Sequence, residues 1–176
     1  MTKNILAVCL DCGDTIVDET TEIKDARGVV QRAQLIPGAA QMVRDLNAAG
    51  YLLALVADGP VGTFENVLTH YELFDLFDAY AISETVGVDK PDARMFRHAL
   101  DQLNIAEMDY GRVVMVGNNL ARDIRGANEL GIMSVWLSWS PRRSKTPMDD
   151  LEVPCYTIQS PQALLPLLEQ IESGKR

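Results

Sequence analysis

The sequence predicts a three-layer α/β/α fold built on a doubly wound parallel sheet, and two observations support this. Short runs rich in Val, Ile, Leu and Ala alternate with segments whose apolar residues recur every three or four positions. The first pattern is typical of strands covered on both faces, and the second of helices with one buried face. Strand and helix in regular alternation indicate a parallel sheet with helices on both sides.

The individual elements follow from these two patterns. Glycines at 50 and 131 end two of the helical segments, where a C-terminal cap is expected. The predicted strands are 4–10, 51–57, 79–83, 112–117 and 132–137, and the predicted helices are 38–50, 62–73, 93–104, 119–131 and 161–172.

Between the first strand and the first helix, a flap hairpin is expected at about 16–35. The run Asp-Ala-Arg-Gly at 25–28 would form its turn. With 176 residues, of which 47% are hydrophobic, the whole chain 1–176 is expected to form a single domain.

Composition excludes several classes of function. The net charge of −9 disfavours a protein that binds the backbone of nucleic acid, although Arg142, Arg143 and Lys145 form a local basic patch that could meet an anion. No apolar stretch approaches the roughly 20 residues of a membrane helix, and no secretion signal is recognisable, so no membrane partner and a cytoplasmic location are expected. The three cysteines are expected to be reduced and buried rather than zinc ligands.

Polar residues after the strands are the candidates for chemistry, because ligands collect beyond the carboxyl ends of parallel strands. Asp11 could attack a phosphorus atom and become an acyl phosphate. Lys90 could supply a fixed positive charge, and Asp123 a further carboxylate for a cation. Each residue alone also fits an ordinary turn or surface role, but their order and spacing together favour a site.

These residues resemble the four motifs of the haloacid dehalogenase superfamily. "DCGDT" follows the first strand, and "LALVADG" occupies the place of the second motif. Lys90 with Pro91 matches the third, and "VGNNLARD" matches the frame of the fourth. The resemblance runs from about residue 4 to 136 and implies a Rossmann-like fold. The short intervals between motifs leave room for the flap but for no cap domain.

The departures from these motifs bear on activity. Gly13 stands where the superfamily's phosphatases carry an acidic residue that protonates the leaving group and then activates water. Ala57 replaces a Ser or Thr that binds the phosphoryl group, Asp58 replaces the adjacent Asn, and Asn118 replaces a metal-binding carboxylate. Asp14 lies one residue beyond the usual acid, and Asp18 or Glu19 on the flap could turn inward instead.

The resemblance implies a magnesium-dependent phosphatase acting on a phosphate ester or an acyl phosphate. It would be slow, because general acid catalysis typically contributes about 10²–10⁴-fold. The implied catalytic residues are Asp11 and Lys90. The implied phosphate-binding residues are Ala57, Asp58, Gly59 and Lys90, and a weak Mg²⁺ site would comprise Asp11, the Gly13 carbonyl, Asn118 and Asp123.

Two alternatives stay open. The first is a catalytically inactive member that binds a phosphorylated ligand or a protein partner. The second, ranked lower, is displacement at carbon by Asp11, as in dehalogenases. Because members without a cap act on large substrates or borrow a neighbouring subunit as a lid, either a small or a larger phosphorylated substrate fits. A homo-oligomer is equally compatible, with the flap at the interface.

Overall fold

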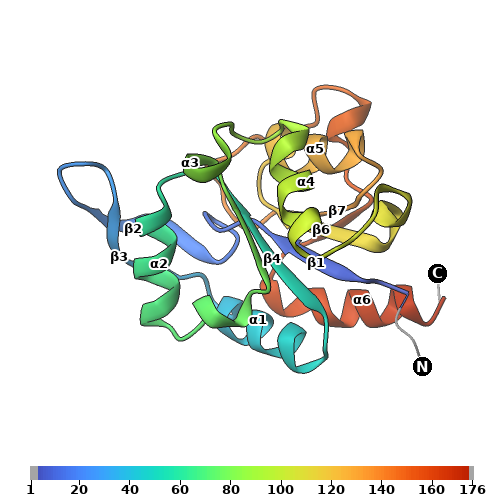
Figure 1. Cartoon of the computed structure of the whole chain (residues 1–176), viewed down its shortest axis with the longest axis horizontal. Helices are drawn as coiled ribbons and strands as arrows, with labels where there is room; N and C mark the ends of the chain where they lie inside the picture. Colours follow the sequence, from blue (N-terminus) through green and yellow to red (C-terminus); the bar gives the residue numbers. More distant parts are fainter. Residues whose placement is uncertain (1–3, 175–176) are drawn as a thin grey trace.

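A computed structural model describes residues 4–174 of the protein, so the two ends of the expected domain, 1–3 and 175–176, lie outside the described residues. Within residues 4–174, six strands form a parallel sheet in the order β5-β4-β1-β6-β7-β8 (Figure 1). The strands of the sheet are β1 (Ala7–Leu10), β4 (Leu52–Ala57), β5 (Ala79–Ile82), β6 (Val113–Gly117), β7 (Met133–Leu137) and β8 (Tyr156–Ile158).

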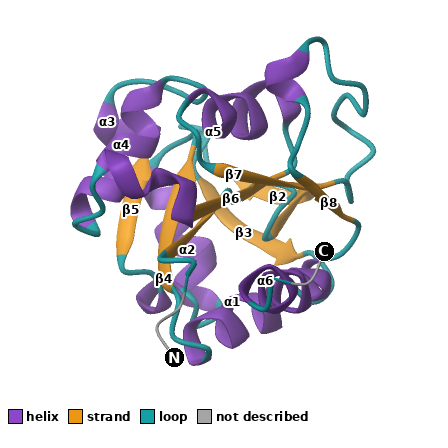
Figure 2. Cartoon of the chain, turned by 90° about the vertical axis from the view of Figure 1, so that its right-hand side faces the viewer, coloured by secondary structure: helices purple, strands orange, loops and turns teal. Residues whose placement is uncertain are grey.

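Helices cover both faces of the sheet, which makes the predicted three layers (Figure 2). Apolar side chains pack on either side of β1: Val8 and Leu10 belong to one core cluster, and Ala7 and Cys9 to the other. One face carries α1 (Ala39–Ala48), α2 (Val61–His70) and α6 (Leu164–Glu172), and the other carries α3 (Ser83–Val86), α4 (Ala93–Gln102) and α5 (Arg125–Glu129).

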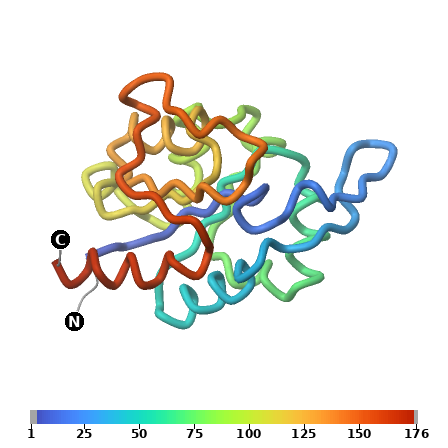
Figure 3. The backbone as a smooth tube through the Cα atoms, turned by 180° about the vertical axis from the view of Figure 1, so that it is seen from behind, coloured from blue at the N-terminus to red at the C-terminus, as the bar shows by residue number. Residues whose placement is uncertain are grey.

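The flap hairpin is formed by β2 (Val17–Lys24) and β3 (Val30–Leu35), which pair antiparallel and project from the sheet (Figures 1 and 3). Helix α2 fixes β3 through side chains. Thr63 Oγ1 accepts from the Val30 N–H at 3.0 Å, and Asn66 Nδ2 donates to the Val30 carbonyl at 3.0 Å. The predicted hairpin at about 16–35 is therefore confirmed, and α2 anchors it where β3 begins, next to the turn.

All five predicted strands are confirmed, but some details differ. The expected helix at 119–131 is instead a π-helical turn, Leu120–Ile124, followed by the short α5. The edge strand β8 was not predicted, because only one of its three residues is buried. Cys9 and Cys12 are buried as expected, but Cys155 is exposed because it lies just before that edge strand.

No helix among residues 4–174 is long and apolar enough to cross a membrane.

Candidate active site

Asp11 lies directly beyond β1 and is held by two side chains. Lys90 Nζ contacts Asp11 Oδ1 at 2.6 Å, and Thr15 Oγ1 donates to Asp11 Oδ2 at 3.1 Å. Lys90 also donates to the Val56 carbonyl at 2.7 Å and is 3% exposed. Burial alone would lower the pKa of Lys90, but the attraction of Asp11 and Asp123 outweighs it and places that pKa above its ordinary value. Lys90 is therefore a fixed cation beside the carboxylate.

Asp123 approaches the same cation from the segment after β6. Its Oδ1 lies 2.8 Å from Lys90 Nζ, and its Oδ2 accepts from the Asn119 N–H at 3.0 Å. A Cβ atom on Gly117 would overlap the Asp123 carboxylate, so only glycine permits this approach. Burial raises the pKa of Asp123, and the negative charge of Asp11 adds to that effect, while Lys90 opposes it.

The residues after β4 are partly committed to other contacts. Asp58 Oδ1 accepts from the Lys90 N–H at 2.9 Å, and Asp58 Oδ2 pairs with Arg122 Nη1 at 3.0 Å. The Gly59 N–H donates to Ser83 Oγ at 2.9 Å. Arg122 is thereby placed beside the site, a position that its helical sequence pattern did not indicate.

A cavity of about 140 Å³ brings most of the predicted site residues together. Of the eight predicted residues, Gly59 does not line this cavity and instead lines an adjoining one. The residues that do line it are Asp11, Gly13, Ala57, Asp58, Lys90, Asn118 and Asp123, with Glu19, Arg122 and Arg143 beside them.

The adjoining cavity, of about 240 Å³, lies under the flap and is called here the flap cavity. It shares Gly13, Glu19, Asp58 and Phe64 with the first cavity, so the two are neighbours. Its lining combines apolar side chains such as Val17 and Val67 with charged residues of β2. A small organic group attached to a phosphoryl group at Asp11 would therefore find a mixed apolar and polar pocket.

The predicted basic patch does meet an anion, but that anion belongs to the chain itself. Arg142 Nε contacts Asp14 Oδ2 at 2.9 Å, and Ser140 Oγ donates to the same oxygen at 2.8 Å. Asp14 is buried with a positive φ of 50°, a conformation that Asp tolerates better than most residues. Asp14 therefore anchors the loop after β7. Lys145 lies apart from this contact and donates to the Ser138 carbonyl.

The donor atoms at the site suit a hard cation such as Mg²⁺. Within residues 4–174, no group of three or more His, Cys, Asp or Glu side chains could hold a metal. Of the four carboxylates that line the first cavity, Asp58 and Glu19 pair with arginines, which leaves Asp11 and Asp123 for a cation. Asn118 Nδ2 is buried and has no hydrogen-bond partner among the described residues. Rotation of this amide would present its oxygen at the same place. Asp11, Asp123 and Asn118 thus fit a magnesium site that is poorer in negative charge than a set of three carboxylates.

The net charge around the first cavity also favours a bound cation. Among the described residues that line it, four are carboxylates and three are cations, which leaves one net negative charge when all are ionised. A phosphate dianion would add to that charge. A divalent cation would offset it, so the lining favours joint binding of cation and phosphate.

Sequence comparison identifies related proteins. A family model described as "haloacid dehalogenase-like hydrolase" matches residues 2–131. The glyceraldehyde 3-phosphate phosphatase of Pyrococcus furiosus is 32% identical over 140 residues, covering 79% of this chain and 56% of that protein. The phosphoserine phosphatase of Thermus thermophilus is 34% identical over 107 residues, covering 61% of this chain and 42% of that protein. The chain thus spans about half the length of the curated relatives it matches.

Structural comparison finds the same fold. A crystal structure titled as a haloacid dehalogenase-type phosphatase from Thermococcus onnurineus superimposes with a TM-score of 0.74 at 20% sequence identity. The match covers 93% of this chain and 98% of that one. At this identity the likeness supports the fold alone.

Proposed function

The chain belongs to the haloacid dehalogenase-like hydrolase family, and on this premise we propose that it is a phosphatase that forms an aspartyl phosphate on Asp11. The observation that carries the proposal is the buried contact of 2.6 Å between Lys90 Nζ and Asp11 Oδ1. It places a fixed cation where negative charge would gather during phosphoryl transfer. The named relatives, which are phosphatases of small phosphorylated molecules, support the same reaction class.

In the proposed first step, an Asp11 oxygen attacks the phosphorus atom and the bond to the leaving oxygen breaks. Thr15 and Lys90 hold one carboxylate oxygen each, which fixes the orientation of the nucleophile. Lys90 stabilises the charge of the phosphoryl oxygens. Ala57 has no hydroxyl for these oxygens, so this wall of the cavity offers them no side-chain donor at that position.

Asp11, Asn118, Asp123 and the Gly13 carbonyl would hold a magnesium ion. When bound, the ion would neutralise phosphoryl oxygens and lower the repulsion between substrate and Asp11. The chain's own contribution is to keep Asp123 close to Asp11 despite their like charges, by placing Lys90 between them. Because Asn118 is neutral, we expect the cation to bind weakly.

The leaving group is expected to be small, since the flap cavity of about 240 Å³ is smaller than the roughly 300–1,000 Å³ of typical ligand pockets. An acyl phosphate or an ester of an acidic alcohol suits the site best, because Gly13 cannot supply a proton to the leaving group. A larger phosphorylated partner could reach Asp11 only with its phosphate on an extended arm.

The test is hydrolysis of p-nitrophenyl phosphate and acetyl phosphate, with Mg²⁺ and with EDTA. Asp11→Asn should abolish turnover, while the matched control Asp101→Asn, an exposed carboxylate on α4, should leave it unchanged. Turnover that survives Asp11→Asn would refute the proposal. A folded protein that turns over neither substrate would favour the binding protein without activity. Release of halide from a haloacid without metal would favour displacement at carbon.

A further inference from the structure

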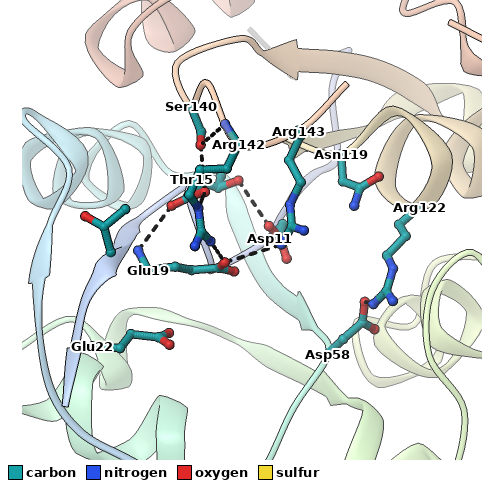
Figure 4. Close-up of polar contacts among 12 residues, drawn as sticks. Asp11, Thr15, Glu19, Glu22, Asp58, Asn119, Arg122, Ser140, Arg142 and Arg143 are labelled. Carbon is teal, nitrogen blue, oxygen red and sulfur yellow. Dashed lines mark hydrogen bonds and ion pairs between the residues drawn. The ribbon is translucent and has the colours of Figure 1, made fainter. Parts of the chain in front are cut away.

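The space above Gly13 is occupied by another acidic side chain. A Cβ atom built on Gly13 would overlap Oε1 of Glu19, and the Glu19 Cδ lies 2.8 Å from it. Figure 4 shows Glu19 extending from the flap toward Asp11. Gly13, Glu19 and Asp11 line the same cavity. The side chain that is absent at Gly13 is thus replaced, in space, by a carboxylate from β2.

The Glu19 carboxylate is held by contacts that leave one oxygen toward Gly13. Arg142 and Arg143 both contact Oε2, the latter at 3.3 Å. The Glu19 N–H donates to Asp14 Oδ1 at 3.1 Å, and Asp14 in turn binds Arg142. This network fixes Glu19 at both its backbone and its carboxylate. Oε1 is the oxygen over Gly13.

We propose that Glu19 is the general base that activates water for hydrolysis of the aspartyl phosphate on Asp11. This inference rests on the proposed phosphatase activity and adds the residue that completes it. Arg142 and Arg143 bind Oε2, so the oxygen that remains to accept a proton is Oε1, which lies over Gly13 in the same cavity as Asp11. Glu19 is thus assigned to the second half-reaction, in which a carboxylate oxygen takes a proton from water.

In this step the water oxygen bonds to phosphorus while the water proton passes to Glu19 Oε1. The bond between phosphorus and the Asp11 oxygen breaks, which returns the Asp11 carboxylate and releases inorganic phosphate. The proton then leaves Glu19 for solvent, since its side chain is 24% exposed. The first half-reaction receives no proton from Glu19, so it should proceed only with leaving groups that are stable as anions.

The test compares Glu19→Gln with Asp18→Asn in rapid-quench experiments on the whole chain with p-nitrophenyl phosphate and Mg²⁺. Asp18 is the neighbouring carboxylate on β2, and successive side chains of a strand point to opposite faces. Glu19→Gln should release about one p-nitrophenolate per protein at the normal rate, after which turnover should fall by about 10²–10⁴-fold. Phosphoryl label should stay on the protein and be released by hydroxylamine. Asp18→Asn should behave as the unaltered protein.

A second variant, Glu19→Ala, is the control for a loss of turnover caused by misfolding. Glu19→Ala opens the space over Gly13, and added formate should restore part of its turnover but none of that of Asp11→Asn. Steady-state turnover of Glu19→Gln within about threefold of normal would overturn the assignment of Glu19 alone. If Glu19→Gln slows the first turnover as much as the later ones, Glu19 acts in substrate binding, and the proposal is overturned. If high Mg²⁺ restores the full turnover of Glu19→Gln, Glu19 acts on the metal, and the proposal is likewise overturned. Absence of turnover in the unaltered protein would overturn the phosphatase proposal together with this one.

Discussion

Gly13→Asp, which would reinstate the acid at its usual place, should destabilise this protein unless Glu19 is removed as well. The new Cβ would overlap the Glu19 carboxylate, and the backbone at Gly13 is not in the left-handed region, so the conflict is one of space and charge. Forcing extra atoms into a well-packed core typically costs about 1–3 kcal/mol, and the lower end of that range applies here because the atom displaced is the end of the Glu19 side chain. A like charge at about 4 Å adds up to about 4 kcal/mol at an effective dielectric of about 20, part of which outward rotation of Glu19 would relieve.

We therefore expect Gly13→Asp to lower the free energy of unfolding by about 2–4 kcal/mol. Glu19→Ala, at a partly exposed position, should lower it by about 1 kcal/mol or less. The double variant should be more stable than Gly13→Asp, with a coupling energy of at least about 1.5 kcal/mol. Urea unfolding of the four proteins in EDTA measures this cycle. If the two changes add within about 0.5 kcal/mol, Glu19 does not occupy the space over Gly13 and the reasoning fails.

Three further outcomes are expected. Lys90→Met should lower the free energy of unfolding by about 3–5 kcal/mol, because it leaves two buried carboxylates without their cation. A loss below about 1 kcal/mol, measured by urea unfolding in EDTA, would refute this. Asn118→Asp should bind Mg²⁺ at least about tenfold more tightly, which corresponds to about 1.4 kcal/mol. The measurement is the rise of Tm on titration with Mg²⁺, which should be larger than in the unaltered protein. An unchanged rise of Tm would show that Asn118 is not part of the metal site. Burial raises the pKa of Cys9 to about 12 and that of Cys12 further, so both stay protonated between pH 7 and 10. Only Cys155 should then react with a thiol reagent before denaturation, and two fast thiols would contradict this.

Elements with uninterrupted apolar runs could be predicted from the sequence, because burial on both faces dictates their composition. β1 and β6 are fully buried along their whole length and were predicted. β8 was missed because its exposed edge residues carry no such pattern. The segment after β6 was expected to be one helix, but it makes a π-helical turn that returns Asp123 to the Asn119 N–H, and periodicity does not reveal such a turn.

The candidate site was predictable where residues follow strands directly. Asp11, Lys90 and Asp123 meet as their order along the sheet implies. The position of Glu19 relative to Gly13 depends on how the hairpin leaves the first strand, and sequence spacing does not fix that direction. The partner of Arg142 was equally hidden, since it lies 128 positions away along the chain. The roles of these residues, the oligomeric state and the cytoplasmic location stay predictions.

The contacts that join Asp14 and Glu19 to the loop after β7 also set the order in which the molecule can become functional. The flap belongs to the first fifth of the chain, whereas Arg142 and Arg143 follow the strand next to the far edge of the sheet. During synthesis from the N-terminus, the hairpin must wait for these arginines until β7 has left the ribosome and paired with β6. A nascent chain that stops before residue 142 would hold Asp11 and Lys90 but lack the clamp on Glu19. Maturation of the site would thus report that the chain has folded as far as β7 and the start of the loop after it.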